Sequence, residues 1–168
     1  MSTEKKITVK RENLFSFRFG LTLLNGVPGV RLGAFRAKLS RAIEAEIKDM
    51  ESFKETEEWQ RIDKMLDSIN LKYATKKHGD ALIKNRRYIY TPEDSKKRDE
   101  EVDKMMESES KAFDERRRLL EEYKNMLGEE AEFNLPTIAL SDIPDSVNSE
   151  VIEILWPVII EDETTPVE

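Results

Sequence analysis

Residues 32–53 read LGAFRAKLSRAIEAEIKDMESF, the stretch with the strongest periodic pattern in the chain. Its large apolar residues recur at spacings of three and four, as on one face of a helix: Leu32, Phe35, Leu39, Ile43, Ile47, Met50 and Phe53. The repeat resumes at Trp59 after one weak step at Thr56, and no proline or glycine interrupts it after Gly33. The pattern predicts a helix over residues 31–74, roughly 60 Å long. An alternative form of this prediction has a bend in the helix near Thr56.

A second long helix is predicted over residues 92–128. Thr91 can cap its first turn, and Pro92 suits the first helical position. Its apolar residues repeat every seven positions, and they are Met105, Ala112, Leu119 and Met126 beside Met106, Phe113, Leu120 and Leu127. Sustained sevens favour a left-handed helix pair, although Glu109 and Arg116 interrupt the seam. We therefore expect this helix to fold back antiparallel onto the first.

Residues 75–91, between the two helices, contain strand-like pieces on either side of Asn85-Arg86, which predicts a β-hairpin at the tip of the helix pair. Residues 72–98 hold nine basic and three acidic side chains, so the tip is basic. Cations interleaved with aromatic rings can pair with anions and stack on bases. The candidate partner-binding residues are Lys76, Lys77, Lys84, Arg86, Arg87, Tyr88 and Tyr90. A solvated hairpin without a partner is the preferred interpretation of this segment by itself, and contact with nucleic acid or with an acidic protein surface is the alternative.

The N-terminal region, residues 1–30, is predicted to hold a short strand at residues 7–9 and then the ambiguous stretch LFSFRFGLTLL at residues 14–24. A strand would align Phe15, Phe17, Phe19, Leu21 and Leu23, whereas a helix would align Leu14, Phe17, Leu21 and Leu24. Asn13 as N-cap and Asn25-Gly26 as a stop favour a short buried helix. A membrane-surface helix would carry a more basic polar face. Interior packing is the preferred interpretation.

The C-terminal region, residues 129–161, is predicted to be acidic and to contain a strand at residues 132–140, a short helix at residues 149–156 and a strand at residues 158–160. Pro136 lacks an amide hydrogen, which favours an edge position for the first of these strands. Residues 162–168 are expected to form a loose tail.

Together these segments predict a mainly α fold with small β elements (α+β), in which a long antiparallel helical hairpin stands on a small strand-containing base. A length of 168 residues suits a single domain over residues 1–168. Charged residues make up 38% of the chain, which is typical of long solvated helices. The absence of cysteine fits a cytoplasmic protein, and no stretch approaches the ~20 apolar residues that span a bilayer. We expect no membrane contact.

Charge is distributed unevenly along the chain. Residues 1–71 hold 13 basic and 11 acidic side chains, and residues 99–168 hold 6 and 21. No lysine or arginine follows Lys124, while eleven acids do. The acids are expected to be neutralised within the fold by Arg31, Arg36, Lys38 and Arg41. An outward acidic surface that imitates nucleic acid is the alternative.

Catalytic and cofactor-binding patterns are not found in the sequence. His78 is the single histidine, so paired-histidine metal sites and motifs with two histidines are excluded. The glycines at 26, 29 and 33 precede no Lys-Ser or Lys-Thr pair of a phosphate-binding loop. We therefore expect no enzyme activity, no cofactor and no metal. Trp59 and Trp156 are interpreted as core residues, with partner contact as the alternative.

In the order and character of its elements, the chain resembles an uncharacterised family of small helical proteins of tailed bacteriophages. The likeness includes the strand and apolar helix at the start, the basic opening of the long helix, the tyrosine-containing hairpin and the ending LPTIALSDI at residues 135–143, followed by WPVI at residues 156–159. The resemblance implies a phage-encoded protein acting in the bacterial cytoplasm. It implies no activity or ligand.

These observations favour a non-enzymatic protein-binding module that occupies or inhibits a host protein. A structural or assembly protein that self-associates as a homo-oligomer through the helical seam is one alternative. Contact with nucleic acid through residues 76–90 is the other, disfavoured by the net charge of −7.

Overall fold

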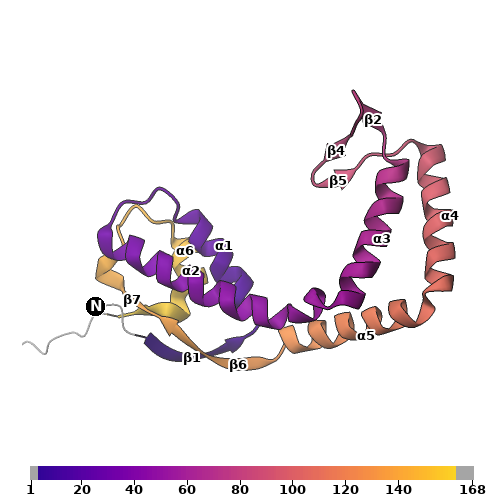
Figure 1. Cartoon of the computed structure of the whole chain (residues 1–168). Coiled ribbons are helices and arrows are strands. Elements are labelled where there is room, and N and C mark those ends of the chain that lie inside the picture. The colour runs from indigo at the N-terminus through magenta and orange to yellow at the C-terminus, as the bar shows by residue number, and fades with distance from the viewer. Residues whose placement is uncertain (1–3, 162–168) are drawn as a thin grey trace, which may run out of the picture. The chain divides into compact units, whose positions relative to one another are not determined.

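A computed structural model describes residues 4–161 of the chain. Within that range, six α-helices contain most of the residues and four two-stranded sheets supply the β-structure (Figure 1). The predicted α+β class with mainly helical content is therefore confirmed. The tail predicted over residues 162–168 lies outside the described residues.

Contacts in the structure gather in two compact units. The terminal unit contains residues 4–50 and 123–161, and the central unit contains residues 51–122. Each unit has its own cluster of buried apolar side chains. The single domain expected from the chain length therefore consists of two separately packed parts.

The sheet of the terminal unit joins the two ends of the described chain. β1 (Glu4–Lys10) pairs antiparallel with β6 (Glu130–Pro136), and the register places Ile7 opposite Phe133, both buried. The strand predicted at residues 7–9 is confirmed. Pro136 is the last residue of β6, where its missing amide hydrogen interrupts no further pairing with β1. Beyond it, β7 (Ile138–Ala139) pairs parallel with β8 (Ile159–Ile160), close to the predicted final strand.

The ambiguous apolar stretch is helical, since α1 spans Asn13–Leu23. Leu14, Phe17 and Leu21 are buried, whereas Phe19 is 55% exposed, as a helical period requires and a strand would not. The predicted capping role of Asn13 is wrong. Glu12 occupies the cap position and makes no side-chain capping bond. Backbone bonds from the first helical amides to the carbonyls of Arg11 and Glu12 close this turn instead.

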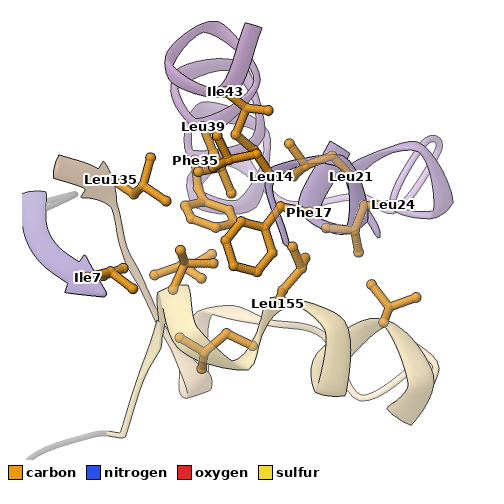
Figure 2. Packing of buried hydrophobic residues seen from close by; sticks show 14 of the residues in the cluster. Ile7, Leu14, Phe17, Leu21, Leu24, Phe35, Leu39, Ile43, Leu135 and Leu155 are labelled. Atoms are coloured by element: carbon orange, nitrogen blue, oxygen red, sulfur yellow. The ribbon is translucent and has the colours of Figure 1, made fainter. Parts of the chain in front are cut away.

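The core of the terminal unit lies between α1, α2 (Val30–Met50), β6 and α6 (Ser149–Leu155) (Figure 2). Each helical turn of α2 contributes, because the three-four pattern buries residues such as Phe35, Leu39 and Ile43. α6 approaches α1 closely: a Cβ added to Gly20 would lie 2.9 Å from Cγ2 of Ile154. The predicted helix at residues 149–156 is confirmed, and interior packing of the apolar stretch is confirmed with it.

The two long helices of the prediction are each divided. α2 ends at Met50, a 3-10 turn covers Ser52–Glu55, and α3 spans Glu57–Tyr73. Thr56 has an extended conformation and its hydroxyl accepts a bond from the amide of Trp59, so it caps α3 and ends the preceding turn. The unbroken helix over residues 31–74 is wrong, because residues 51–56, where the alternative form of the prediction places a bend, interrupt it.

The second long helix is divided at Glu109 into α4 (Pro92–Ser108) and α5 (Ser110–Leu127). Thr91 caps α4 as predicted, because its hydroxyl accepts a bond from the amide of Asp94 at 3.1 Å. α4 packs against α3, and α2 packs against α1 and β6 within the terminal unit. The expected pairing of two unbroken helices along their full length is therefore wrong.

Arg116 and Glu109, the two charged residues on the heptad seam, make contacts with the first turns of α3. Arg116 lies 3.8 Å from the ring centre of Trp59, donates to the Trp59 carbonyl at 2.9 Å and pairs with Asp63 at 2.7 Å. Glu109 accepts two bonds from Arg61. Trp59 is buried, as predicted. Trp156 is 47% exposed, so its interpretation as a core residue is wrong.

Candidate binding surface on the central unit

The tip of the central unit consists of two consecutive hairpins rather than the single one predicted. β2 (Lys76–Lys77) pairs with β3 (Asp80–Ala81), and β4 (Ile83–Lys84) pairs with β5 (Arg87–Tyr88), both antiparallel. The hairpin around Asn85-Arg86 is the predicted one. The first was missed, although His78-Gly79 between two short polar pieces is a recognisable turn signal. We name residues 76–88 the basic hairpin pair.

A closed ring of three backbone hydrogen bonds holds the base of the basic hairpin pair. The amide of Thr75 donates to the carbonyl of Ile89 at 2.8 Å, the amide of Leu82 donates to Thr75 at 2.7 Å, and the amide of Ile89 donates to Leu82 at 3.0 Å. These three residues are spaced by seven, so each hairpin occupies one interval of the same length. The ring fixes both hairpins at the end of the α3–α4 pair (Figure 1).

Both hairpins turn through two residues with positive φ. The first uses His78 (φ 55°) and Gly79 (φ 93°), and the second uses Asn85 (φ 51°) and Arg86 (φ 62°). This conformation costs an L-residue about 1–2 kcal/mol, which glycine avoids and asparagine tolerates better than most. Arg86 therefore occupies a position where glycine would be less strained.

The structure places all five predicted cations on the surface of this region. Lys76, Lys77, Lys84, Arg86 and Arg87 are exposed, and none lies within ion-pair distance of a carboxylate of the described residues. Residues 75–91 contain these five cations and one acid, Asp80, which gives a local charge of +4 by subtraction.

The arginines elsewhere in the central unit differ from those of the basic hairpin pair. Each of them has a carboxylate partner within the described residues: Arg61, Arg98, Arg116, Arg117 and Arg118. Among the arginines that the structure describes, Arg86 and Arg87 alone make neither an ion pair nor a side-chain hydrogen bond. The hairpin pair thus carries positive charge that the fold does not neutralise.

The two predicted tyrosines make contacts inside the unit. The Tyr88 hydroxyl donates to Asp67 on α3 at 3.1 Å, and this bond to a carboxylate raises the Tyr88 pKa. The ring of Tyr90 lies 5.1 Å from the guanidinium carbon of Arg98. These rings anchor the second hairpin to the helices, whereas the cations face outward.

Ile83 is an exposed residue of the surface that the sequence prediction did not select. It lies on β4 beside Lys84 and is 62% exposed. An apolar side chain among unpaired cations offers a partner area to bury as well as charge to pair with. No sequence signal separated it from the half-buried Leu82 next to it.

One face of the α3–α4 pair carries two ion pairs that join the helices. Lys72 bonds Glu101 at 2.6 Å, with the Tyr73 hydroxyl donating to the same carboxylate at 2.6 Å, and these bonds lower the Glu101 pKa. Arg61 bonds both oxygens of Glu109 at 2.9 and 2.8 Å and lowers the Glu109 pKa. Both carboxylates favour the folded state while they are ionised.

These lowered pKa values predict acid sensitivity of the central unit. A carboxylate with a depressed folded-state pKa stabilises the fold above its ordinary value of 4.5, and loses that contribution as pH falls through the folded-state pKa. Urea unfolding followed by Trp59 fluorescence, in a Trp156→Phe background, should show a midpoint that declines from pH 6 to pH 3. In Glu101→Gln/Glu109→Gln the decline should be smaller. Equal declines would contradict the assignment.

The acidic C-terminal segment is partly neutralised within the terminal unit. Arg31 pairs with Asp142 at 2.8 Å, as expected. Arg11 pairs with Glu129 at 3.2 Å, and Lys6 pairs with Glu132. The other expected cations do not take part: Arg36 bonds the Leu24 carbonyl and the Asn25 amide oxygen, Arg41 bonds the Ala37 carbonyl, and Lys38 has no carboxylate partner among the described residues. The pairing of β1 with β6 places Lys6 and Arg11, which the prediction did not name, beside acids of the C-terminal segment.

Comparison with models of protein families, with curated proteins and with solved structures finds no match. Within residues 4–161, no helix combines the length and apolar content needed to cross a membrane. The same range contains no group of three or more histidine, aspartate and glutamate side chains placed to hold a metal ion.

Proposed function

We propose that this protein is a non-enzymatic binding module that places the basic hairpin pair against an acidic surface of a protein partner. The observation that carries the proposal is the set of exposed cations that have no carboxylate partner among residues 4–161, in a unit whose other arginines are all paired. The α3–α4 pair is the support that presents this surface. Occupation of the partner inhibits it, and the setting is the cytoplasm of a bacterium infected by the phage that encodes the protein.

The backbone at Arg86 supports the same proposal. Strained residues persist where surrounding structure or function retains them. The equivalent position of the first hairpin is Gly79, so the hairpin pair itself contains the less strained solution. Keeping an arginine at φ 62° costs stability and places a guanidinium at the end of the second hairpin. A role for that guanidinium outside the fold explains the cost.

A protein partner is favoured over nucleic acid by the position of the aromatic rings. Single-stranded nucleic acid is bound by cations together with rings on which bases stack. Tyr88 is held by Asp67, and Arg98 lies over the ring of Tyr90, so the cations are not accompanied by free rings. Ile83 adds an exposed apolar side chain, which suits a protein surface.

Arg86→Gly tests this proposal because it moves stability and binding in opposite directions. Relief of the positive φ is expected to stabilise the central unit by about 0.5–1 kcal/mol, after allowance for the greater freedom of glycine in the unfolded chain. Capture of the partner from nuclease-treated bacterial lysate should fall at least fivefold. Urea unfolding and quantitative mass spectrometry of the retained proteins measure the two effects.

The control must remove an exposed charge outside the hairpin pair without weakening a helix. Arg117→Gly would place glycine inside α5, so the control is Lys111→Gln, which removes one exposed charge from the same helix without that cost. It should retain the partner. Partner capture by Arg86→Gly at the wild-type level would refute the proposed surface. Loss of capture on nuclease treatment alone would identify a nucleic acid instead, and retention of further copies of the chain alone would identify self-association.

A further inference from the structure

The α3–α4 pair carries a second surface, apart from the basic hairpin pair. A shallow groove of about 530 Å³ runs between the two helices. Its floor is apolar and consists of Met65 and Ile69 from α3 and Met105 from α4. Ser68 and Ser108 also line it with short side chains, while Ile69 and Met105 are less than 10% exposed, so the groove lies over the packed seam.

Ion pairs between the helices mark both ends of this groove. The Arg61–Glu109 pair lies at one end, where Arg61 is one helical turn from Met65. The Lys72–Glu101 pair lies at the other end, where Lys72 is one helical turn from Ser68 and Ile69. The lining residues extend over about two helical turns, or roughly 10 Å. The groove thus has the length of a short helical segment and does not continue along the helices.

The charge at the rim of the groove is positive. Lys64 and Lys104 line it, and neither has a carboxylate within ion-pair distance among the described residues. Glu101, the one acid of the lining, is already bonded to Lys72 and Tyr73. An occupant therefore meets an apolar floor with the ammonium groups of Lys64 and Lys104 beside it, and Lys104 also attracts the Glu101 carboxylate.

We propose that this groove receives a short amphipathic helix of a protein partner, with large apolar side chains that enter between Met65 and Met105 and acidic residues that face Lys64 and Lys104. Helices recognised in grooves insert apolar residues three and four positions apart and are oriented by charges at the rim. Methionine suits the floor because its flexible side chain adapts to the shape of the inserted residue. This inference uses one part of the proposed function, namely that the partner is a protein.

The test uses the full-length chain and two synthetic 18-residue peptides. Both carry leucine along one helical face; one has glutamate and the other lysine at the flanking positions. The ε-methyl signals of Met65 and Met105 should move on addition of the glutamate peptide, while that of Met126 in the terminal unit stays. The lysine peptide should bind at least tenfold more weakly. Lys64→Glu/Lys104→Glu should reverse this preference.

Ser68→Tyr fills the groove at an exposed position, so it should abolish peptide binding without loss of the fold, and Ser110→Tyr outside the groove is its matched control. Equal affinity for the two peptides, or unmoved Met65 and Met105 signals, would overturn the inference. Arg86→Gly should bind the peptide like the wild type. If the wild-type chain fails to bind the peptide while Arg86→Gly loses lysate capture, the groove is rejected and the proposed function stands.

Discussion

Lys84→Glu/Arg86→Glu/Arg87→Glu is expected to weaken binding of the captured protein partner by at least about 100-fold. Two unit charges 4 Å apart in water interact by about 1 kcal/mol, and reversal replaces attraction by repulsion of similar size. Three reversals therefore exceed the ~2.7 kcal/mol that corresponds to 100-fold. Most of the change should appear in the association rate. Titration of the purified partner at 50 and 300 mM salt measures it.

The matched control reverses three cations outside the hairpin pair, Lys48→Glu/Lys96→Glu/Lys111→Glu. These side chains are exposed and have no ion-pair partner among the described residues, so the net charge changes equally. The control should bind the partner within about threefold of the wild type, because screening over ~8 Å limits the reach of distant charges. A comparable loss in both triple variants would show that total charge, rather than this surface, governs binding.

Phe17→Ala is expected to destabilise the terminal unit by about 3–5 kcal/mol. Phe17 is 2% exposed and lies in the core between α1, α2 and α6 (Figure 2). Deletion of a buried ring removes its transfer free energy and leaves a cavity that rigid neighbours fill incompletely. Urea unfolding followed by Trp156 fluorescence, in a Trp59→Phe background, measures the loss.

Phe19→Ala is the matched control two residues away on the same helix. Its side chain is 55% exposed, so its removal should cost less than about 1 kcal/mol. A strand would give the two phenylalanines equal burial and equal cost, which makes the pair a direct test of the helical assignment. Equal losses would contradict the packing described for α1.

The binding role of the basic tip stays a prediction, and the sequence indicates its composition better than its geometry. Charge counting identified the basic tip, because an excess of cations over acids is a property of composition. It could not separate the outward cations from the tyrosines, whose partners Asp67 and Arg98 lie on two different helices. The hydrogen-bond ring of Thr75, Leu82 and Ile89 depends on three backbone segments meeting, which no local pattern reports.

The groove between α3 and α4 was missed for a related reason. The heptad pattern assigns Met105 to the seam and does not select Met65. In the structure Ile69 and Met105 are buried and Met65 is partly buried, all three in the packing of the helix pair. Whether such a seam is filled depends on the neighbours across it. Ser68 and Ser108 are too short to fill it here, and their alignment follows from the register of α3 against α4. That register is a tertiary property.

The sequence by itself determined which segments are helical, which face of each is buried and where the positive charge lies, since helical period, capping residues and composition are local properties. Tertiary structure decided the second break at Glu109, which parts of the long helices pack together and which charges remain unneutralised among residues 4–161. Thr56 ends the first break by a local capping bond, whereas residues flanking the break at Glu109 make contacts such as Arg116 on Trp59 and Arg61 on Glu109. Those contacts join residues about 50 positions apart, beyond the reach of any repeat in the sequence.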